Sequence, residues 1–187
     1  MTTPLRLTVA EYDRMIEQGI FDDRPERRLE LIHGEIREIP PPNPPHAYVI
    51  DLLGYWSIDQ APRDQVHVRI QNPLGIPALD SVTVPDVAWM KSRDYRRKRP
   101  EPRDVLLVIE VSESSLAYDR GEKANLYAAS GLKDYWVVNV NDSCIEVHRR
   151  PRSGEYRNIE TFSTGQSVSP LAFPEITLKV ESLFAGS

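Results

Sequence analysis

The sequence predicts an α/β fold, in which a mixed β-sheet core is flanked by helices and accompanied by additional β-hairpins. Helical segments with capping signals alternate with short apolar strands along the chain. Residues 105–109 are apolar on both faces, which is typical of a central strand covered by helices. The chain has 187 residues, of which 40% are hydrophobic. That length suits one hydrophobic core, so we expect a single domain over residues 1–187.

The chain begins with a predicted helix followed by a hairpin. Thr8 and Glu11 form a capping box, so the helix should start there and run to about Gln18. Apolar and polar residues alternate over residues 28–39, with a His-Gly pair at the expected turn. This alternation predicts two short antiparallel strands.

A second helix should follow the proline-rich connector at residues 40–45. Asn43 and Pro44 suit the N-cap and the first helical position. The apolar face of this helix would consist of Val49, Leu52, Leu53 and Trp56. Strands are expected next over residues 66–70 and 82–90.

The C-terminal half should contain a third helix and another hairpin. Asp119 is expected to cap the helix, with Glu122 at its third position and its end near Gly131. Residues 135–140 and 144–149 predict the hairpin.

Composition bears on compartment and on partners. The longest aliphatic run is far shorter than the roughly 20 residues needed to span a bilayer, and no secretory signal is expected at the N-terminus. Cys144 is the single cysteine, so we expect a cytoplasmic protein without disulfides. The net charge of -5 is atypical of a non-specific nucleic-acid binder. Residues 91–104, however, carry seven basic and three acidic side chains.

Two carboxylates interrupt apolar strands. Glu110 directly follows the aliphatic run of residues 105–109, and Asp86 lies within Val84-Pro85-Asp86-Val87. A buried carboxylate is unfavourable unless it is paired or holds a cation. Either residue could instead be a strand-end charge in water or a turn cap.

Lys123 should lie in the first turn of the third helix, where its charge opposes the helix dipole. This favours a specific role, although a solvated lysine is the simpler alternative. Two carboxylates and an ammonium together suit a phosphodiesterase site, since carboxylates bind Mg²⁺ and an ammonium orients water or neutralises developing charge. Glu30, on the early hairpin, is either a further ligand or supporting base, or an outward-facing strand residue.

The order of these motifs is similar to that of a known family. The chain contains Leu-Glu-Leu-Ile-His-Gly-Glu, Pro-Asp-Val, Ile-Glu-Val-Ser and Tyr-Asp-Arg-Gly-Glu-Lys-Ala-Asn-Leu-Tyr in that order. From about Thr8 to Phe184 it resembles the Uma-two family of restriction-endonuclease-like proteins, within the PD-(D/E)XK nuclease superfamily.

The resemblance implies a restriction-endonuclease-like fold, with Asp86 and Glu110 as the two acidic motif residues. It also matches Glu30 to the superfamily's acidic residue near the first core element. The superfamily places a lysine two residues after the glutamate, but Ser112 stands there in this chain. The resemblance therefore points to Lys123 on the following helix.

We accordingly expect an endonuclease dependent on Mg²⁺ or Mn²⁺ that hydrolyses phosphodiester bonds in DNA. Asp86, Glu110, Lys123 and Glu30 would be its catalytic residues, and Asp86 and Glu110 would bind the metal. A homodimer is expected because many nucleases cut two strands with two subunits. The alternative is a non-catalytic binding or assembly module with the same fold, which the acidic net charge and the displaced lysine favour. Another phosphodiester or a nucleotide would require the same metal chemistry.

Two further features are candidates. Arg96, Arg97, Lys98 and Arg99 would bind nucleic-acid phosphates from a loop that lies either near the metal site or at the opposite edge of the sheet. A solvated polar loop is the alternative. His46 could approach the site from the start of the second helix, although a structural hydrogen bond is the simpler interpretation.

Overall fold

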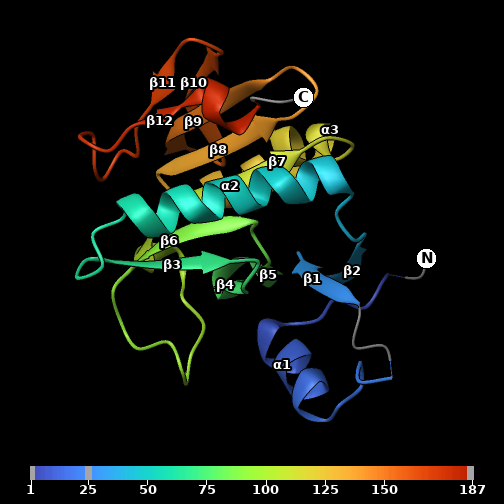
Figure 1. Cartoon of the computed structure of the whole chain (residues 1–187). Coiled ribbons are helices and arrows are strands. Elements are labelled where there is room, and N and C mark those ends of the chain that lie inside the picture. The colour runs from blue at the N-terminus through green and yellow to red at the C-terminus, as the bar shows by residue number, and fades with distance from the viewer. Residues whose placement is uncertain (1–2, 24–26, 185–187) are drawn as a thin grey trace.

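The computed structural model describes residues 3–23 and 27–184 and is built around a six-stranded mixed sheet (Figure 1). The strand order of this sheet is β10-β9-β8-β7-β6-β3, and a four-stranded antiparallel sheet has the order β2-β1-β5-β4. The short strands β11 and β12 pair with each other. The strands are β1 (Arg28–Ile32), β2 (Glu35–Ile39), β3 (Val66–Ile70), β4 (Leu74–Ile76), β5 (Ser81–Thr83), β6 (Val87–Lys91), β7 (Val105–Ser112), β8 (Asp134–Asn139), β9 (Cys144–Arg152), β10 (Glu155–Ser163), β11 (Ser167–Val168) and β12 (Leu178–Lys179).

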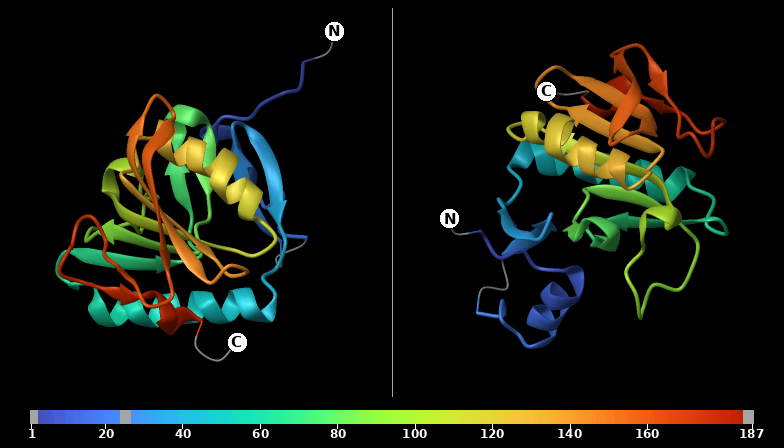
Figure 2. Two further views of the ribbon diagram at one scale, coloured as in Figure 1. Left: turned by 90° about the horizontal axis from the view of Figure 1, so that it is seen from above. Right: turned by 180° about the vertical axis from the view of Figure 1, so that it is seen from behind.

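The helices differ greatly in length. The longest, α2, covers one face of the large sheet, and a composite helical segment covers the other (Figures 1 and 2). The helices are α1 (Val9–Glu17), α2 (Pro44–Gln60), α3 (Leu116–Tyr118) and α4 (Ala124–Ala129), with a π-helical turn η3 (Asp119–Lys123) joining the last two. Short 3₁₀ turns are η1 (Pro77–Leu79), η2 (Pro102–Asp104) and η4 (Val180–Leu183).

The strand β7 is the central, covered strand that the sequence predicts. It pairs antiparallel with β6 and parallel with β8. Leu107, Val108 and Ile109 are each fully buried. Leu107 and Ile109 belong to the cluster that includes α2 residues, whereas Val108 packs with residues of α4. Each such side chain stabilises the fold by roughly 1.5–3 kcal/mol, so β7 is a rigid support for the residues that follow it.

The capping box, the hairpin turn and the helix N-cap predicted for the N-terminal third are confirmed. The Thr8 side chain accepts from the backbone of Glu11, and the Glu11 carboxylate accepts from the backbone of Thr8. His33 and Gly34 have φ angles of 49° and 80°, the left-handed conformation that the tight turn between β1 and β2 requires. Asn43 caps α2, its side chain accepting from the backbone of His46.

The strand predicted over residues 82–90 is divided into two. β5 belongs to the four-stranded sheet, and β6 belongs to the six-stranded sheet. The break falls at residues 84–86, where Pro85 has no N–H to donate to a ladder. Asp86 therefore lies at the crossing between the two sheets rather than inside a continuous strand.

The predicted start of the third helix is wrong. The helical segment begins at Leu116, so Asp119 lies inside it and does not cap it. Lys123 is consequently not in the first turn, and the argument from the helix dipole does not apply to it. The C-terminal end agrees with the prediction, because α4 stops at Ala129 and Gly131 has a φ of 81°.

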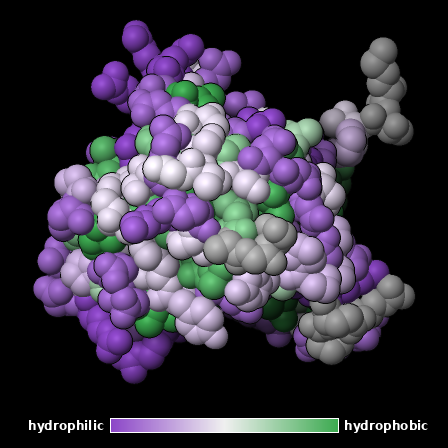
Figure 3. Space-filling model, turned by 45° about the horizontal axis from the view of Figure 1, so that its top comes forward, coloured by the Kyte–Doolittle hydropathy of each residue, from purple (hydrophilic) through white to green (hydrophobic). Residues whose placement is uncertain are grey.

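The outer surface carries scattered hydrophobic side chains. On the face shown in Figure 3, hydrophobic residues are interspersed with polar ones. Large contiguous apolar patches mark many protein–protein interfaces, and this view shows none of that kind. The homodimer stays a prediction. No helix within the described ranges is both long and apolar enough to cross a membrane.

Candidate active site

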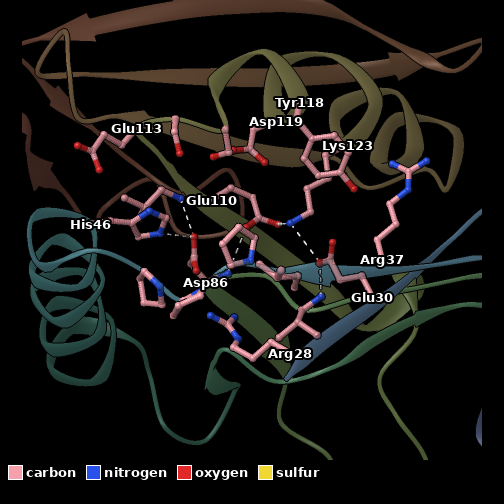
Figure 4. A pocket seen from close by; sticks show the side chains of 18 of the residues that line it. Arg28, Glu30, Arg37, His46, Asp86, Glu110, Glu113, Tyr118, Asp119 and Lys123 are labelled. Atoms are coloured by element: carbon pink, nitrogen blue, oxygen red, sulfur yellow. Dashed lines mark hydrogen bonds and ion pairs between the residues drawn. The ribbon is translucent and has the colours of Figure 1, made fainter. Parts of the chain in front are cut away.

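A pocket of about 290 Å³ lies at one end of β6 and β7, and the four residues predicted to be catalytic line it (Figure 4). Glu30 comes from β1, Asp86 from the crossing before β6, Glu110 from β7 and Lys123 from η3. Because β6 and β7 are antiparallel, Asp86 and Glu110 lie opposite each other just beyond the last paired residues. The backbone N–H of Asp86 is 3.3 Å from Glu110 Oε2. Four elements of the chain thus meet in one pocket.

Lys123 is held between two glutamates. Its Nζ lies 2.9 Å from Glu110 Oε1 and 3.2 Å from Glu30 Oε1, and the residue is only 6% exposed. Burial lowers the pKa of Lys123, but the neighbouring carboxylates outweigh it and hold the pKa well above its usual value. Lys123 is therefore a cation, and the alternative of a solvated lysine is wrong.

Glu110 is deeply buried in the site. It is 3% exposed, and burial raises its pKa to about 8, although the ammonium of Lys123 opposes this shift. The hydroxyl of Tyr127, which lies four residues after Lys123 on the helical segment, donates to Glu110 Oε1 at 2.8 Å. Glu110 is thus not a strand-end charge in water.

Glu30 points inward from the hairpin. Its Oε1 accepts from the backbone N–H of Val84 at 2.7 Å and also contacts the ammonium of Lys123. With 2% of its surface exposed, Glu30 is not the outward-facing strand residue that the sequence left open. It links the four-stranded sheet to the centre of the site.

Asp86 is the carboxylate whose ionised form is stabilised most clearly. Burial alone would raise its pKa, but contacts with His46 and with the backbone N–H of Val111 lower it below the usual value. Asp86 Oδ2 lies 2.9 Å from Val111 N and 3.4 Å from His46 Nε2, and Oδ1 accepts from Gln71 at 3.2 Å. The partner of His46 is thus a site carboxylate.

Asp119 was missed as a site residue because it was assigned to a helix cap. It is 3% exposed, lines the pocket, and accepts from the hydroxyls of Ser112 at 2.7 Å and Ser115 at 2.6 Å. Burial raises its pKa. The spacing of four residues between Asp119 and Lys123, which puts both on one helical face, was the signal available in the sequence. Ser112, two residues after Glu110, donates to Asp119 from the end of β7.

The pocket contains more acidic than basic side chains. Its lining includes six carboxylates and three cations: Glu30, Glu38, Asp86, Glu110, Glu113 and Asp119 against Arg28, Arg37 and Lys123. Among residues 3–23 and 27–184, no group of three or more His, Cys, Asp or Glu side chains is arranged to hold a metal ion. Mg²⁺ keeps several waters and often uses only one or two carboxylates. Asp86 and Glu110 fit that type of site, and the acidic surplus favours a divalent cation.

The basic loop lies at the opposite end of the same strands. Residues 92–104 connect the far ends of β6 and β7, away from Asp86 and Glu110 (Figure 1). Arg96 pairs with Asp94 at 2.7 Å, Lys98 pairs with Glu101 at 2.5 Å, and Arg99 pairs with Asp13. The sequence allowed this loop to lie near the metal site or at the opposite edge of the sheet, and in the structure it lies away from the site. Phosphate binding by Arg96, Arg97, Lys98 and Arg99 stays a prediction.

Comparison with known proteins agrees with this architecture. A crystal structure described as "a putative nuclease belonging to DUF820", from Anabaena variabilis, superposes with a TM-score of 0.70 and 16% sequence identity, covering 96% of this chain and 98% of that chain. At this identity the likeness confirms the mixed α/β fold only. A comparison with proteins of curated function gave no match. The family model Uma2, described as "Putative restriction endonuclease", matches residues 9–181. The chain therefore belongs to the Uma2 family.

Proposed function

We propose that this protein is a divalent-metal-dependent endonuclease that hydrolyses phosphodiester bonds in DNA. The observation that carries the proposal is the buried ammonium of Lys123, held between Glu110 and Glu30 in the pocket that also contains Asp86. Burying two carboxylates and an ammonium opposes folding unless their geometry is well satisfied. Perturbed, buried ionisable groups in a pocket are typical of catalytic sites.

Each residue of the site has a role in this chemistry. Asp86 and Glu110 would hold Mg²⁺ or Mn²⁺, which supplies Lewis-acid stabilisation of the phosphoryl group and a more acidic bound water. Lys123 orients the attacking water or neutralises charge that develops on the phosphoryl oxygens. Glu30 fixes the position of Lys123 through their 3.2 Å contact.

The direct test is a nuclease assay with Mg²⁺ and with Mn²⁺ on linear, circular and single-stranded DNA. Asp86→Asn and Glu110→Gln should each lower the rate by roughly 100-fold or more, because the metal contributes several kcal/mol to the barrier. Glu146→Gln is a matched control: Glu146 is a carboxylate of β9 that is 6% exposed and bound to Arg120, outside the pocket lining. Glu146→Gln should change the free energy of unfolding and leave the rate of DNA cutting unchanged.

The proposal fails if both pocket variants cut at the wild-type rate. It also fails if the wild type cuts no DNA form with either metal. Circular dichroism of each variant separates lost chemistry from lost folding.

The alternative is a non-catalytic module that binds or assembles through this fold. The absence of a three-residue metal cluster from the described ranges supports it, as does the full pairing of Lys123 by its two glutamates. Thermal unfolding against Mn²⁺ concentration discriminates the two. A metal site at Asp86 should stabilise the wild type by about 2.7 kcal/mol at 100 times the dissociation constant, and Asp86→Asn should abolish this gain. A module without a metal site would show no gain in either protein.

A homodimer is part of the proposal, since two sites are needed to cut both strands in one encounter. Sedimentation equilibrium at micromolar concentration should give twice the chain mass of 21.4 kDa. A monomer that cuts both strands equally fast would remove the dimer and leave the catalytic assignment unchanged.

A further inference from the structure

We infer that Arg28 binds a phosphate group of the substrate strand, an assignment that rests on the proposed function. Arg28 is one of three cations that line the pocket. Within the part of the chain that the structure describes, its side chain forms no hydrogen bond or ion pair, and no dashed line joins it to another residue in Figure 4. The other two cations are already engaged.

Arg37 and Lys123 each have carboxylate partners. Arg37 donates to both oxygens of Glu122, at 2.6 and 2.8 Å. Lys123 is shared between two glutamates. Glu38, another acidic residue of the pocket lining, pairs with Arg27 at 3.3 Å and so does not occupy Arg28. The guanidinium of Arg28 is consequently the cation that an incoming anion can use without breaking an ion pair.

The position of Arg28 on β1 directs it to the site. Arg28 and Glu30 are two residues apart on one strand, so their side chains leave the same face of the sheet. Glu30 reaches Lys123 from that face. In Figure 4 the side chain of Arg28 leaves β1 next to Glu30, among the residues that line the pocket. An anion bound to Arg28 would thus lie beside the acidic residues proposed to hold the metal.

The nearby start of α2 does not offer backbone donors for this purpose. Pro44 and Pro45 have no N–H, and the N–H of His46 is bound by the side chain of Asn43. Helix N-termini commonly bind phosphate through free backbone N–H groups. At the α2 side of the pocket the recognition of phosphate therefore falls to side chains, and the planar fork of an arginine matches two phosphate oxygens.

The simpler interpretation is that Arg28 offsets the acidic surplus of the pocket and remains solvated. If only the positive charge matters, lysine should replace arginine. A contact through two N–H groups to phosphate requires the guanidinium. Comparing Arg28→Ala with Arg28→Lys therefore separates the two interpretations.

The experiment measures binding of a fluorescein-labelled oligonucleotide to the full chain by anisotropy, with Ca²⁺ in place of Mg²⁺ and again in EDTA. Arg28→Ala should weaken binding roughly tenfold to 100-fold, as expected for loss of a charge-assisted bidentate contact. Arg28→Lys should recover only part of this loss. The matched control is Arg63→Ala, since Arg63 is exposed and lies outside the pocket; it should bind like the wild type.

Equal affinity of Arg28→Ala and wild type overturns the inference, whether or not the wild type cuts DNA. Equal losses of affinity in Arg28→Ala and Arg63→Ala overturn it as well, because the loss would then follow from the protein's overall charge. Full recovery by Arg28→Lys also rejects the bidentate contact. If the losses are as expected but no metal supports cutting, Arg28 stands as a phosphate ligand and the proposed function falls. Thermal unfolding of both Arg28 variants verifies that each is folded.

Discussion

The two ends of the paired strands β6 and β7 carry charge in opposite ways. At one end, Asp86 and Glu110 are 7% and 3% exposed and share a pocket with Lys123. At the other end, the loop of residues 92–104 carries a surplus of basic side chains on the surface. There Arg96 is 87% exposed and is paired with its near neighbour Asp94, whose own side chain is 58% exposed.

This difference shows where charge in a sequence indicates function. The loop has the denser cluster of charged residues, yet exposed pairs of this kind contribute only about 0–1 kcal/mol and are screened by salt. The carboxylates stand singly in apolar stretches of chain, and each is kept out of water at a large desolvation penalty. A single charged residue in a buried strand is therefore the stronger signal, because folding tolerates it only when something compensates.

The largest predicted effect is on stability at the buried end. Lys123→Met leaves Glu110 and Glu30 buried without their cation, so it should lower the free energy of unfolding by about 3–5 kcal/mol. Urea denaturation at pH 8.5 measures the effect. The matched change at the exposed end is Arg96→Ala, which should lower the same quantity by less than about 1 kcal/mol. Losses of similar size in both variants would remove the contrast between the two ends.

A second prediction concerns pH and the single residue Glu110. Burial raises its pKa to about 8 in the folded protein from an ordinary value of 4.5. Between these pH values the unfolded chain has released the proton and the folded chain retains it. The free energy of unfolding should therefore fall as the pH rises through this window, by at most about 1.4 kcal/mol per unit, and level off above it.

Urea denaturation of the metal-free protein from pH 5 to 9 tests this slope. Glu110→Gln should flatten the profile across the window, because the variant has no proton to lose at that position. The lowered pKa of Asp86 acts in the opposite direction, since its stabilisation is lost at acidic pH, below this window. Profiles of wild type and Glu110→Gln that run parallel from pH 5 to 8 would show that Glu110 titrates normally.

Most of the fold follows from local signals in the sequence. The capping box at Thr8, the turn at Gly34 and the N-cap at Asn43 are short-range hydrogen-bonding patterns, and all three occur as expected. The assignment of residues 82–90 to one strand failed because periodicity cannot show which sheet a strand joins. The start of the third helix failed because Asp119 suits a cap, while its actual partners, Ser112 and Ser115, become close only in the folded chain.

Four residues of the site were predictable from the sequence, whereas Asp119 and the contacts among the residues were not. Asp86, Glu110, Lys123 and Glu30 were expected from buried charge and from the family resemblance, and they do meet. The contact of His46 with Asp86 joins the start of α2 to the crossing before β6, and no sequence spacing encodes it. Arg28 gave no signal of its own, because its distinguishing property is the lack of an ion-pair partner in the described structure.

The smallest predicted effect is at the basic loop, where Arg96, Lys98 and Arg99 already have acidic partners and lie away from the pocket. Each phosphate contact contributes about 0.9 to the slope of log affinity against log salt. We expect the variant in which Arg96, Arg97, Lys98 and Arg99 are all alanine to reduce this slope by about one contact or less.

The single variant Arg97→Ala should account for most of that change, since the structure gives Arg97 no ion pair among the described residues. Anisotropy titrations at several salt concentrations measure the slopes. A decrease equivalent to three or four contacts in the quadruple variant would mean that the loop exchanges its internal ion pairs for DNA phosphates. In that case DNA would have to extend along β6 and β7 from the pocket to the loop, and both ends of the strands would form one binding surface.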